Sequence, residues 1–327
     1  MKLAIIGATG VVGNTFINIL EQDLHIFIDQ LYLLSSSRSA GKKIMFKGKE
    51  HTILELTETF FEENKIDYAL FCAGGKISLK YAPIAAKNNC IVIDNSSAWR
   101  MESGVPLIVP EVNIDAANGH KGIIANPNCA AIQGVVALKP LHDAYTLKRV
   151  VYSTYQAVSG AGQGALDDLR DGINGAAPKT FAHPIAFNLI PQIDLFDNET
   201  GYTKEELKII EETQKILGLN ALKMTATAVR VPVINGHSIS ANIEFEKSFT
   251  LEEVRDVLAK APGLVLQDDI SDSLYPMPLA CSGKDEVFVG RIRRDPSVEN
   301  GLNIFIVADN LKKGAALNAV QILKQIM

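Results

Sequence analysis

The stretch KLAIIGATGVVG (residues 2–13) decides the fold of this chain. A short apolar run, Leu3 to Ile6, leads into three glycines spaced G-x-x-G-x-x-G, and an amphipathic segment, 12–21, follows. A strand, a tight turn and a helix in this order open a doubly wound α/β domain, where glycines let the backbone approach a pyrophosphate at the helix start. The pattern departs from G-x-G-x-x-G, so its position between strand and helix is what favours dinucleotide binding over a merely structural turn.

Short apolar runs separated by amphipathic segments continue to about residue 130, which is typical of a parallel sheet covered by helices on both faces. Further strands are predicted at 31–34, 68–72, 91–93, 107–109 and 123–125, with a helix at 78–88.

The pattern changes after about residue 149 to longer strands with two-residue alternation, which suits a sheet with one buried face. Strands are predicted at 151–156, 224–231, 239–245, 287–292 and 303–307, and helices at 204–217, 251–260 and 311–326. Thr250 and Glu253 have the spacing of a capping box at the start of the second of these helices.

The predicted fold is therefore α/β with two domains. Residues 1–129 form a doubly wound, Rossmann-type dinucleotide-binding domain, and residues 130–309 form an α+β domain with a mostly antiparallel sheet. The last helix, within 310–327, follows the final strand directly, and we expect it to complete the first domain.

Composition argues against several classes of function for this chain. The 327 residues carry 32 Lys plus Arg and 37 Asp plus Glu, a net charge of -5, with no basic cluster, which argues against nucleic-acid binding. No apolar run reaches the length of about 18 residues that a membrane span needs, and the first run is too short for a signal peptide, so a cytoplasmic protein is expected. The four cysteines form no C-x-x-C pair, and no metal site is predicted.

The loop after the second strand, SSSRSAGK (residues 35–42), bears on which dinucleotide binds. Sites that prefer NAD usually place an acidic residue there for the ribose 2′-hydroxyl. Hydroxyl groups and the fixed cation of Arg38 would instead accept a 2′-phosphate, so NADP is favoured. The alternative is a polar loop that binds no ligand.

Cys129 differs from Cys72, Cys90 and Cys281, for which the role of a small buried hydrophobe is the expectation. It follows Asn128, a good N-cap residue, and opens an apolar segment, so its sulfur is predicted in the first turn of a helix. The helix dipole and the free N–H groups at that position stabilise a reactive thiolate, which makes Cys129 a candidate nucleophile.

A thiolate that works beside a nicotinamide needs a proton shuttle, and His237 is the first candidate because it follows a strand and a turn. His183 is a weaker competitor. Arg230 ends an otherwise apolar strand, where its planar guanidinium could hold a carboxylate; extension of the side chain into solvent at the strand edge is the alternative.

These motifs, taken in order, resemble the aspartate-β-semialdehyde dehydrogenase family, in its short bacterial-type branch, over nearly the whole chain. The resemblance rests on the following segments, quoted with their residue numbers: GATG (7–10), DNSSAWR (94–100), VPEVN (109–113), NPNC (126–129), STYQAVSGAG (153–162), IPQID (190–194), RVPVINGH (230–237) and DNL (309–311).

The resemblance implies NADPH-dependent reductive dephosphorylation of β-aspartyl phosphate to aspartate β-semialdehyde through a cysteine thioester, in lysine, threonine and methionine biosynthesis. Cys129 would be the nucleophile, His237 the acid/base and Gln156 the residue that orients the acyl group. Residues 130–309 would then be the catalytic and dimerisation domain, and a homodimer or a dimer of dimers is expected.

The resemblance also assigns the remaining site residues. Arg230 would hold the substrate α-carboxylate and Glu205 its amino group. Lys208, Arg100 and Asn128 would hold phosphate, which with β-aspartyl phosphate and aspartate semialdehyde completes the small-molecule partners. The residues that would bind NADP are Gly7, Thr9, Gly10, Val11, Val12, Ser36, Arg38, Ser39, Ser159, Gly160 and Asn310.

Two departures from the family pattern stand out. Ala130 occupies a position where the family usually has Ser or Thr, and residues 172–184 are shorter than the usual insertion. Two alternatives remain open. One is an enzyme like N-acetyl-glutamyl-phosphate reductase, against which Arg230 and the Glu205 and Lys208 pair favour a free amino acid. The other is a non-catalytic NADP-binding paralogue, against which Cys129 and His237 are both present.

Overall fold

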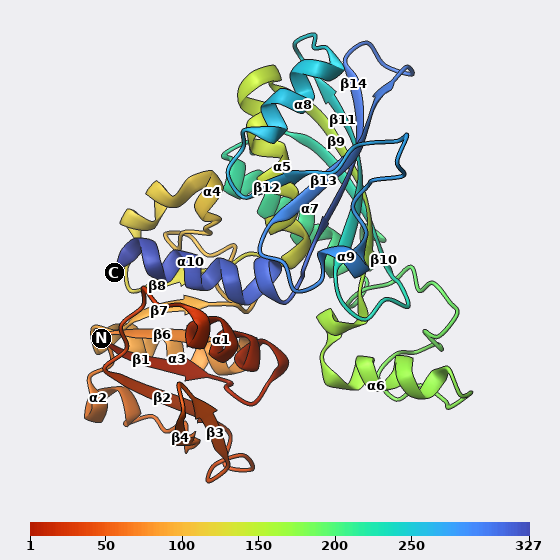
Figure 1. Ribbon diagram of the computed structural model, residues 1–327. Coiled ribbons are helices and arrows are strands. Elements are labelled where there is room, and N and C mark those ends of the chain that lie inside the picture. Colours follow the sequence, from red (N-terminus) through yellow and green to blue (C-terminus); the bar gives the residue numbers. More distant parts are fainter. The chain divides into compact units, whose positions relative to one another are not determined.

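The computed structural model describes all 327 residues, and the chain divides into two compact units. The first comprises residues 1–127 with 315–327, and the second comprises residues 128–314 (Figure 1). The division expected from the sequence placed these boundaries after residues 129 and 309.

The first unit is built on a six-stranded parallel sheet in the order β5-β2-β1-β6-β7-β8. The strands are β1 (Lys2–Ile6), β2 (Gln30–Ser35), β5 (Leu54–Glu55), β6 (Tyr68–Phe71), β7 (Ile91–Asp94) and β8 (Ile123–Ala125), and a separate hairpin pairs β3 (Lys43–Phe46) with β4 (Lys49–Thr52). The strand order reverses at β1, and in open parallel sheets ligands bind at the carboxyl ends of the strands at such a point. The glycine loop leaves β1 at that end.

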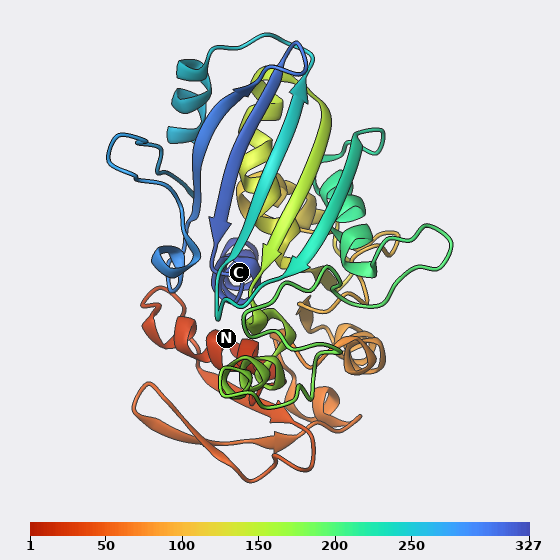
Figure 2. The same ribbon diagram turned by 90° about the vertical axis from the view of Figure 1, so that its right-hand side faces the viewer.

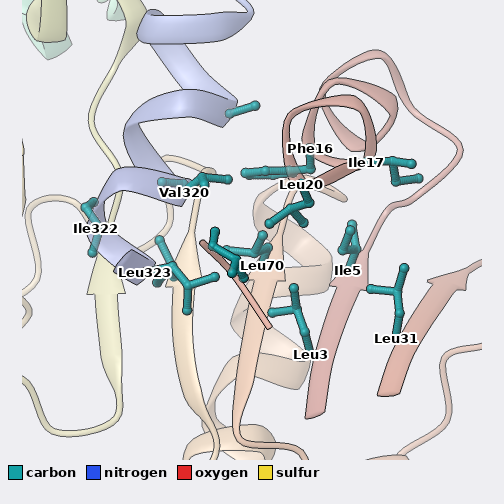
Figure 3. Close-up of a cluster of buried hydrophobic side chains, with 14 of the residues drawn as sticks. Leu3, Ile5, Phe16, Ile17, Leu20, Leu31, Leu70, Val320, Ile322 and Leu323 are labelled. Atoms are coloured by element: carbon teal, nitrogen blue, oxygen red, sulfur yellow. The ribbon is translucent and has the colours of Figure 1, made fainter. Parts of the chain in front are cut away.

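Helices cover both faces of this sheet. Successive residues of β1 point to opposite faces, so they pack against different helices. Leu3 and Ile5 pack against α1 (Val11–Gln22) and α10 (Leu317–Ile326), a cluster drawn in Figure 3. Ala4 and Ile6 pack in a second cluster with residues of α2 (Phe60–Asn64) and α3 (Gly75–Lys87). The short α4 (Pro110–Asn113) and the 3₁₀ helix η1 (Ile114–Gly119) complete the unit.

Two predicted elements differ from the structure. No strand forms at 107–109; Leu107 makes only an isolated bridge to Ala125. The predicted helix 311–326 is interrupted, since a π-helix, η3 (Lys312–Ala316), precedes α10. The carboxylate of Asp309 accepts the N–H groups of Leu311 and Lys312, each at 2.9 Å, and so caps this turn.

The second unit is built on a mixed six-stranded sheet in the order β10-β9-β11-β14-β13-β12. Its strands are β9 (Leu147–Gln156), β10 (Lys223–Arg230), β11 (His237–Phe245), β12 (Leu264–Leu266), β13 (Val287–Asp295) and β14 (Gly301–Ala308). The three central pairings are antiparallel and the two outer pairings are parallel. In Figure 2 these strands lie in front of α5 (Cys129–Tyr145), which packs on the opposite face of the sheet.

The other helices of this unit are η2 (Val158–Ala161), α6 (Gln163–Gly172), α7 (Lys204–Leu217), α8 (Leu251–Ala259) and α9 (Pro278–Cys281). The predicted capping box at Thr250 and Glu253 is confirmed, and a second one, Thr203 with Glu206, starts α7. The second capping box fixes where α7 begins and so which residues of that helix lie on its inner face.

Replacing Gly13 by alanine is expected to destabilise the first unit. A Cβ atom there would lie 2.3 Å from the Gly7 carbonyl oxygen and 2.8 Å from the Ala8 Cα, both of which are backbone atoms that cannot rotate away. We expect a loss of about 1–3 kcal/mol in the free energy of unfolding, measured by chemical denaturation. Gly10→Ala is the control; its nearest neighbour would be 3.4 Å away, and we expect a loss below about 1 kcal/mol. Equal losses would contradict this account of the loop.

Candidate active site

Cys129 is the first residue of α5, as predicted, and Asn128 is its N-cap. The Asn128 Oδ1 atom accepts the N–H groups of Ala130 at 2.9 Å and Ala131 at 3.3 Å. The cap leaves the half-buried sulfur in the first turn of a 17-residue helix, where the positive end of the helix dipole favours a thiolate. Ala130 is fully buried, and the cap is complete without a hydroxyl group at that position.

The other three cysteines are in unfavourable settings for a nucleophile. Burial raises the pKa of Cys72 to about 12, that of Cys90 to about 12 and that of Cys281 to about 11. A thiol whose pKa lies so far above neutrality is almost entirely protonated, so these residues fit the expected role of small hydrophobes.

Glu205 links several of the predicted substrate-binding residues of the second unit. Its Oε1 atom accepts the amide of Asn128 at 2.8 Å and the amide of Gln156 at 3.2 Å. Its Oε2 atom lies 3.6 Å from the ammonium of Lys208, which is one turn further along α7. The Lys208 ammonium also pairs with Asp194 at 2.6 Å. One buried carboxylate therefore joins the N-cap of α5, the end of β9 and the inner face of α7.

Glu212 was missed by the sequence analysis. It is 1% exposed, and its Oε2 atom accepts the N–H of Asn128, the residue directly before Cys129, at 2.6 Å. Glu205, Lys208 and Glu212 follow an i, i+3, i+7 pattern, so they share one face of α7. That spacing was the signal available in the sequence.

Arg230 ends β10 and is buried. Its Nη1 donates to the Ala157 carbonyl oxygen at 2.8 Å, its Nε has no partner, and it forms no salt bridge. Burial lowers the pKa of Arg230, while the negative charges of Glu205 and Cys129 oppose that shift. A buried guanidinium with a free Nε donor is an incomplete ion pair, and a ligand carboxylate would complete it.

His237 starts β11 and is fully buried. Its Nδ1 accepts the N–H of Ala157 at 3.0 Å, and its Nε2 is buried with no partner. Burial, and secondarily the charge of Arg230, hold the pKa of His237 well below its usual range, so the ring is neutral near pH 7. His183, the weaker candidate, is exposed in the loop before Ile185.

The loop after β9 covers both of these side chains. A Cβ atom on Gly160 would lie 3.2 Å from the Arg230 Nη1 and 3.2 Å from the His237 Nε2, so a side chain there would displace one or the other. Next to it, Ser159 donates to Asn235 at 3.1 Å and accepts from the Asn310 amide at 2.9 Å. Asn310 in turn accepts the Gly236 N–H at 2.8 Å, which fixes the turn before His237.

The residues predicted to bind a dinucleotide lie in the first unit, except Ser159, Gly160 and Asn310. Gly7 has φ +97° and lies against Cys72 and Ala73, so no side chain fits there. Gly10 is the N-cap of α1 and gives it no side-chain cap, which leaves the N–H groups of Val11 and Val12 available to an anion.

The loop after β2 also fits a dinucleotide. Thr9 Oγ1 lies 3.0 Å from Ser35 Oγ and so joins the glycine loop to the end of β2. Ser36 and Ser39 form a turn, with the Ser39 N–H donating to the Ser36 carbonyl at 2.9 Å. Arg38 is exposed and has no ion-pair partner. The uncapped start of α1 and the unpaired cation of Arg38 are both groups that can accept a phosphate.

Arg100 also lies in the first unit, on a rigid support. Its Nε donates to the Asn126 carbonyl at 2.9 Å and its Nη2 to the Asn95 carbonyl at 3.1 Å. The loop that carries it is held by the buried carboxylate of Asp94, which accepts from Ser78 and Ser96. The backbone contacts fix the guanidinium in one orientation.

The short segment 172–184 is tied to α6 by Asp168. This carboxylate accepts the N–H groups of Lys179, Thr180 and Phe181 at 2.8 to 2.9 Å. Burial acts to raise the pKa of Asp168, but the three N–H donors outweigh it and lower the pKa. A charged side chain of α6 therefore fixes the backbone of residues 179–181 within this short segment.

No group of three or more His, Cys, Asp or Glu side chains is placed to hold a metal ion. No helix has the length and apolar character needed to cross a membrane.

Two family descriptions match the chain in order: "Semialdehyde dehydrogenase, NAD binding domain" over residues 2–120 and "Semialdehyde dehydrogenase, dimerisation domain" over residues 138–313. An aspartate-semialdehyde dehydrogenase of Aquifex aeolicus is 52% identical over 98% of this chain and 96% of its own length. One of Bacillus subtilis is 48% identical over 100% of this chain and 97% of its own. The crystal structure of aspartate semialdehyde dehydrogenase II from Vibrio cholerae matches with a TM-score of 0.93 and 42% identity over 99% of this chain and 98% of that one, and a structure of that enzyme complexed with ASA matches equally well.

Proposed function

Because this chain belongs to the aspartate-semialdehyde dehydrogenase family, we propose that Cys129 is its nucleophile and carries the acyl group as a thioester. The reaction is the NADPH-dependent reductive dephosphorylation of β-aspartyl phosphate to aspartate β-semialdehyde, a step toward lysine, threonine and methionine. The observation that carries the assignment is the position of the thiol. Cys129 is the first residue of α5, and its thiol interacts electrostatically with the buried Arg230. That arginine has no carboxylate partner in the protein, and its Nε makes no hydrogen bond.

The second unit supplies the groups that recognise an amino acid. Arg230 offers its unpartnered Nε to the α-carboxylate, and the buried carboxylate of Glu205 binds the ammonium group. Lys208, Asn128 and Arg100 are assigned to the phosphate by the family pattern. Gln156 orients the acyl group, since its amide belongs to the same network as the N-cap of the nucleophile's helix.

The thioester accounts for the need for cysteine. Attack by the Cys129 thiolate on the acyl phosphate releases phosphate while the acyl group stays activated on sulfur. When bound, the cofactor supplies the hydride that reduces this acyl group. The protein's contribution is to hold the acyl carbon on Cys129 and to place hydrogen-bond donors around its oxygen.

The first unit is the dinucleotide-binding domain of this family, and our assignment of NADP rests on the serine residues and the unpaired Arg38 after β2. The other residues of the first unit assigned to the cofactor lie at the same end of its sheet: Gly7, Thr9, Gly10, Val11, Val12, Ser36 and Ser39. The family pattern also assigns Ser159, Gly160 and Asn310 to the cofactor.

Replacing Arg38 by aspartate is expected to raise the Kd for NADPH about 10- to 100-fold, because the 2′-phosphate loses a charge-assisted hydrogen bond. The Kd for NADH should change by less than about twofold, since NADH has no such phosphate. Lys49→Asp, on β4, makes the same charge change without an assigned contact and is the control. Binding is measured by fluorescence titration. Equal weakening of both cofactors would refute the assigned role.

Oligomerisation follows from the dimerisation domain, and we propose a homodimer, or a dimer of dimers, that forms through the helix-free face of the second sheet. On this face the ring centroids of Tyr155 and Phe305 lie 6.3 Å apart, and Tyr155 is 38% exposed. We expect a dimer in sedimentation experiments at concentrations on the order of micromolar, and a shift to monomer in Tyr155→Asp. A wild-type monomer under these conditions would contradict the proposal.

The substrate is tested by phosphate-dependent reduction of NADP with aspartate semialdehyde, beside N-acetylglutamate semialdehyde. We expect activity with the first aldehyde only, since Arg230 and Glu205 fit a free amino acid. Activity only with the acetylated aldehyde would keep the chemistry and replace the substrate. Inactivity with both, while NADP still binds, would favour the non-catalytic paralogue.

A further inference from the structure

Lys208 lies between two carboxylates of the second unit. Its ammonium donates to the Asp194 Oδ2 at 2.6 Å, and the Glu205 Oε2 lies 3.6 Å from it. Two carboxylates against one ammonium leave an excess of negative charge around the cation that the family pattern assigns to phosphate. Because phosphate is itself an anion, it must compete with these carboxylates for the ammonium.

The two carboxylates differ in how easily they can give way. The Glu205 side chain is 8% exposed, and its Oε1 also accepts the amides of Asn128 and Gln156. The Asp194 side chain is 35% exposed and that of Lys208 is 27% exposed, so a ligand can approach their contact from solvent. Asp194 is therefore the partner that phosphate can replace.

Asp194 lies on a segment that is anchored at both ends. At one end, Ile190 and Arg230 exchange backbone hydrogen bonds, with donor–acceptor distances of 3.0 and 2.8 Å. At the other end, the Lys204 N–H, at the start of α7, donates to the Leu195 carbonyl at 2.8 Å. The segment therefore joins the end of β10 to the start of α7 and fixes the backbone on either side of Asp194.

The local geometry aims the Asp194 carboxylate. Its backbone is in the left-handed region, with φ +69°, and its Oδ1 accepts the N–H of Leu195 at 2.8 Å. Burial acts to raise the pKa of Asp194, but the hydrogen bonds from Lys208 and Leu195 and the charge of Lys208 outweigh it and lower the pKa. The group is therefore ionised near pH 7, with one oxygen held by the next backbone N–H and the other directed at Lys208.

We propose that Asp194 is the exchangeable counter-ion of Lys208, which holds the ammonium in position and weakens the binding of phosphate to it. The inference rests on the proposed function, in which Lys208 binds the phosphate. Phosphate departs when the acyl group is transferred to Cys129, and a carboxylate that takes the ammonium back favours that departure. Asp194 acts through Lys208 and is therefore a positioning residue.

Replacing Asp194 by asparagine removes the charge with little change in shape. Asparagine keeps an oxygen for the Leu195 N–H and tolerates the positive φ. We expect the Kd for inorganic phosphate to fall about three- to tenfold, measured by ³¹P NMR titration of the full-length protein. An unchanged or raised Kd would overturn the proposal.

Two further variants support this test. Asp194→Gly also suits the positive φ and removes the carboxylate altogether, so a similar fall in Kd is expected and the test does not depend on one variant folding. Asp197→Asn makes the same charge change nearby, at a carboxylate that accepts the N–H groups of Glu199 and Thr200. It should change the Kd by less than about twofold. A tightening equal to that in Asp194→Asn would reveal a general effect of charge and overturn the proposal.

A double-mutant cycle tests whether Asp194 acts through Lys208. We expect Lys208→Met to raise the Kd for phosphate at least about tenfold, and Asp194→Asn to have no further effect in that background. An undiminished tightening there would overturn the proposal. If Lys208→Met leaves the Kd unchanged, the assignment of Lys208 in the proposed function is wrong and the inference falls with it. If Lys208→Met weakens binding but Asp194→Asn does not tighten it, the inference alone fails.

Steady-state kinetics separate this role from structural damage. In Asp194→Asn the KM for phosphate should fall by about the same factor as the Kd, while the KM for aspartate semialdehyde changes by less than about twofold, since the aldehyde carries no phosphate. A rise in both KM values would mean that Asp194 only maintains the site, and would overturn the proposal.

Discussion

Cys129→Ser is expected to lower kcat at least about 10³-fold in both directions of the reaction, with folding and NADP binding unchanged. A serine hydroxyl is far harder to ionise than a thiol at a helix N-terminus, and an ester conserves less acyl activation than a thioester. The measurement is the steady-state rate of NADP reduction with aspartate semialdehyde and phosphate.

Cys90→Ala is the matched control for this substitution, because Cys90 is buried in the first unit and belongs to no proposed site. It should retain full activity. If Cys129→Ser keeps more than about a tenth of the wild-type rate, the assignment of the nucleophile is wrong.

Arg230→Lys is expected to lower kcat/KM for aspartate semialdehyde by about 30- to 3,000-fold, equivalent to about 2–5 kcal/mol. Lysine keeps the charge but cannot offer two parallel N–H donors to a carboxylate or reproduce the bond from Nη1 to Ala157. Arg294→Lys is the control. That arginine also donates to a backbone carbonyl, at 2.8 Å to Phe249, but has no proposed substrate contact.

A truncated substrate separates recognition from structural damage. An aldehyde that lacks the α-carboxylate should be a poor substrate for the wild type and should lose little further activity in Arg230→Lys. A loss as large as with aspartate semialdehyde would mean that Arg230 maintains the site and does not read the carboxylate.

Local rules predicted the elements whose signals lie within a few residues of each other. The glycine loop, the cap formed by Asn128 and the position of Cys129 in the first turn of α5 all follow from neighbouring residues. Helix α7 spans the predicted residues 204–217 because a strong periodic pattern coincides with a capping box. The predicted strand at 107–109 is wrong because a short apolar run does not reveal whether a neighbouring strand pairs with it.

The contacts that position the site could not be predicted in the same way. Gln133 and Glu212 occupy ordinary helical positions, and their importance depends on the His237 carbonyl and the Asn128 N–H, which are 104 and 84 residues away in the chain. The π-helix at 312–316 places Gly314 against Cys129, where a Cβ atom would lie 2.9 Å from that of the cysteine. Close approaches of this kind arise from tertiary packing, which no window of sequence contains.

The central claim, a thioester on Cys129, is tested most directly by trapping it. The protein is mixed with aspartate semialdehyde and NADP without phosphate, quenched with acid, and its peptides are analysed by mass spectrometry. The account predicts an aspartyl adduct on the peptide that contains Cys129, and its loss when phosphate is added before the quench. An adduct on another cysteine, or steady turnover with phosphate but no adduct without it, would contradict the account.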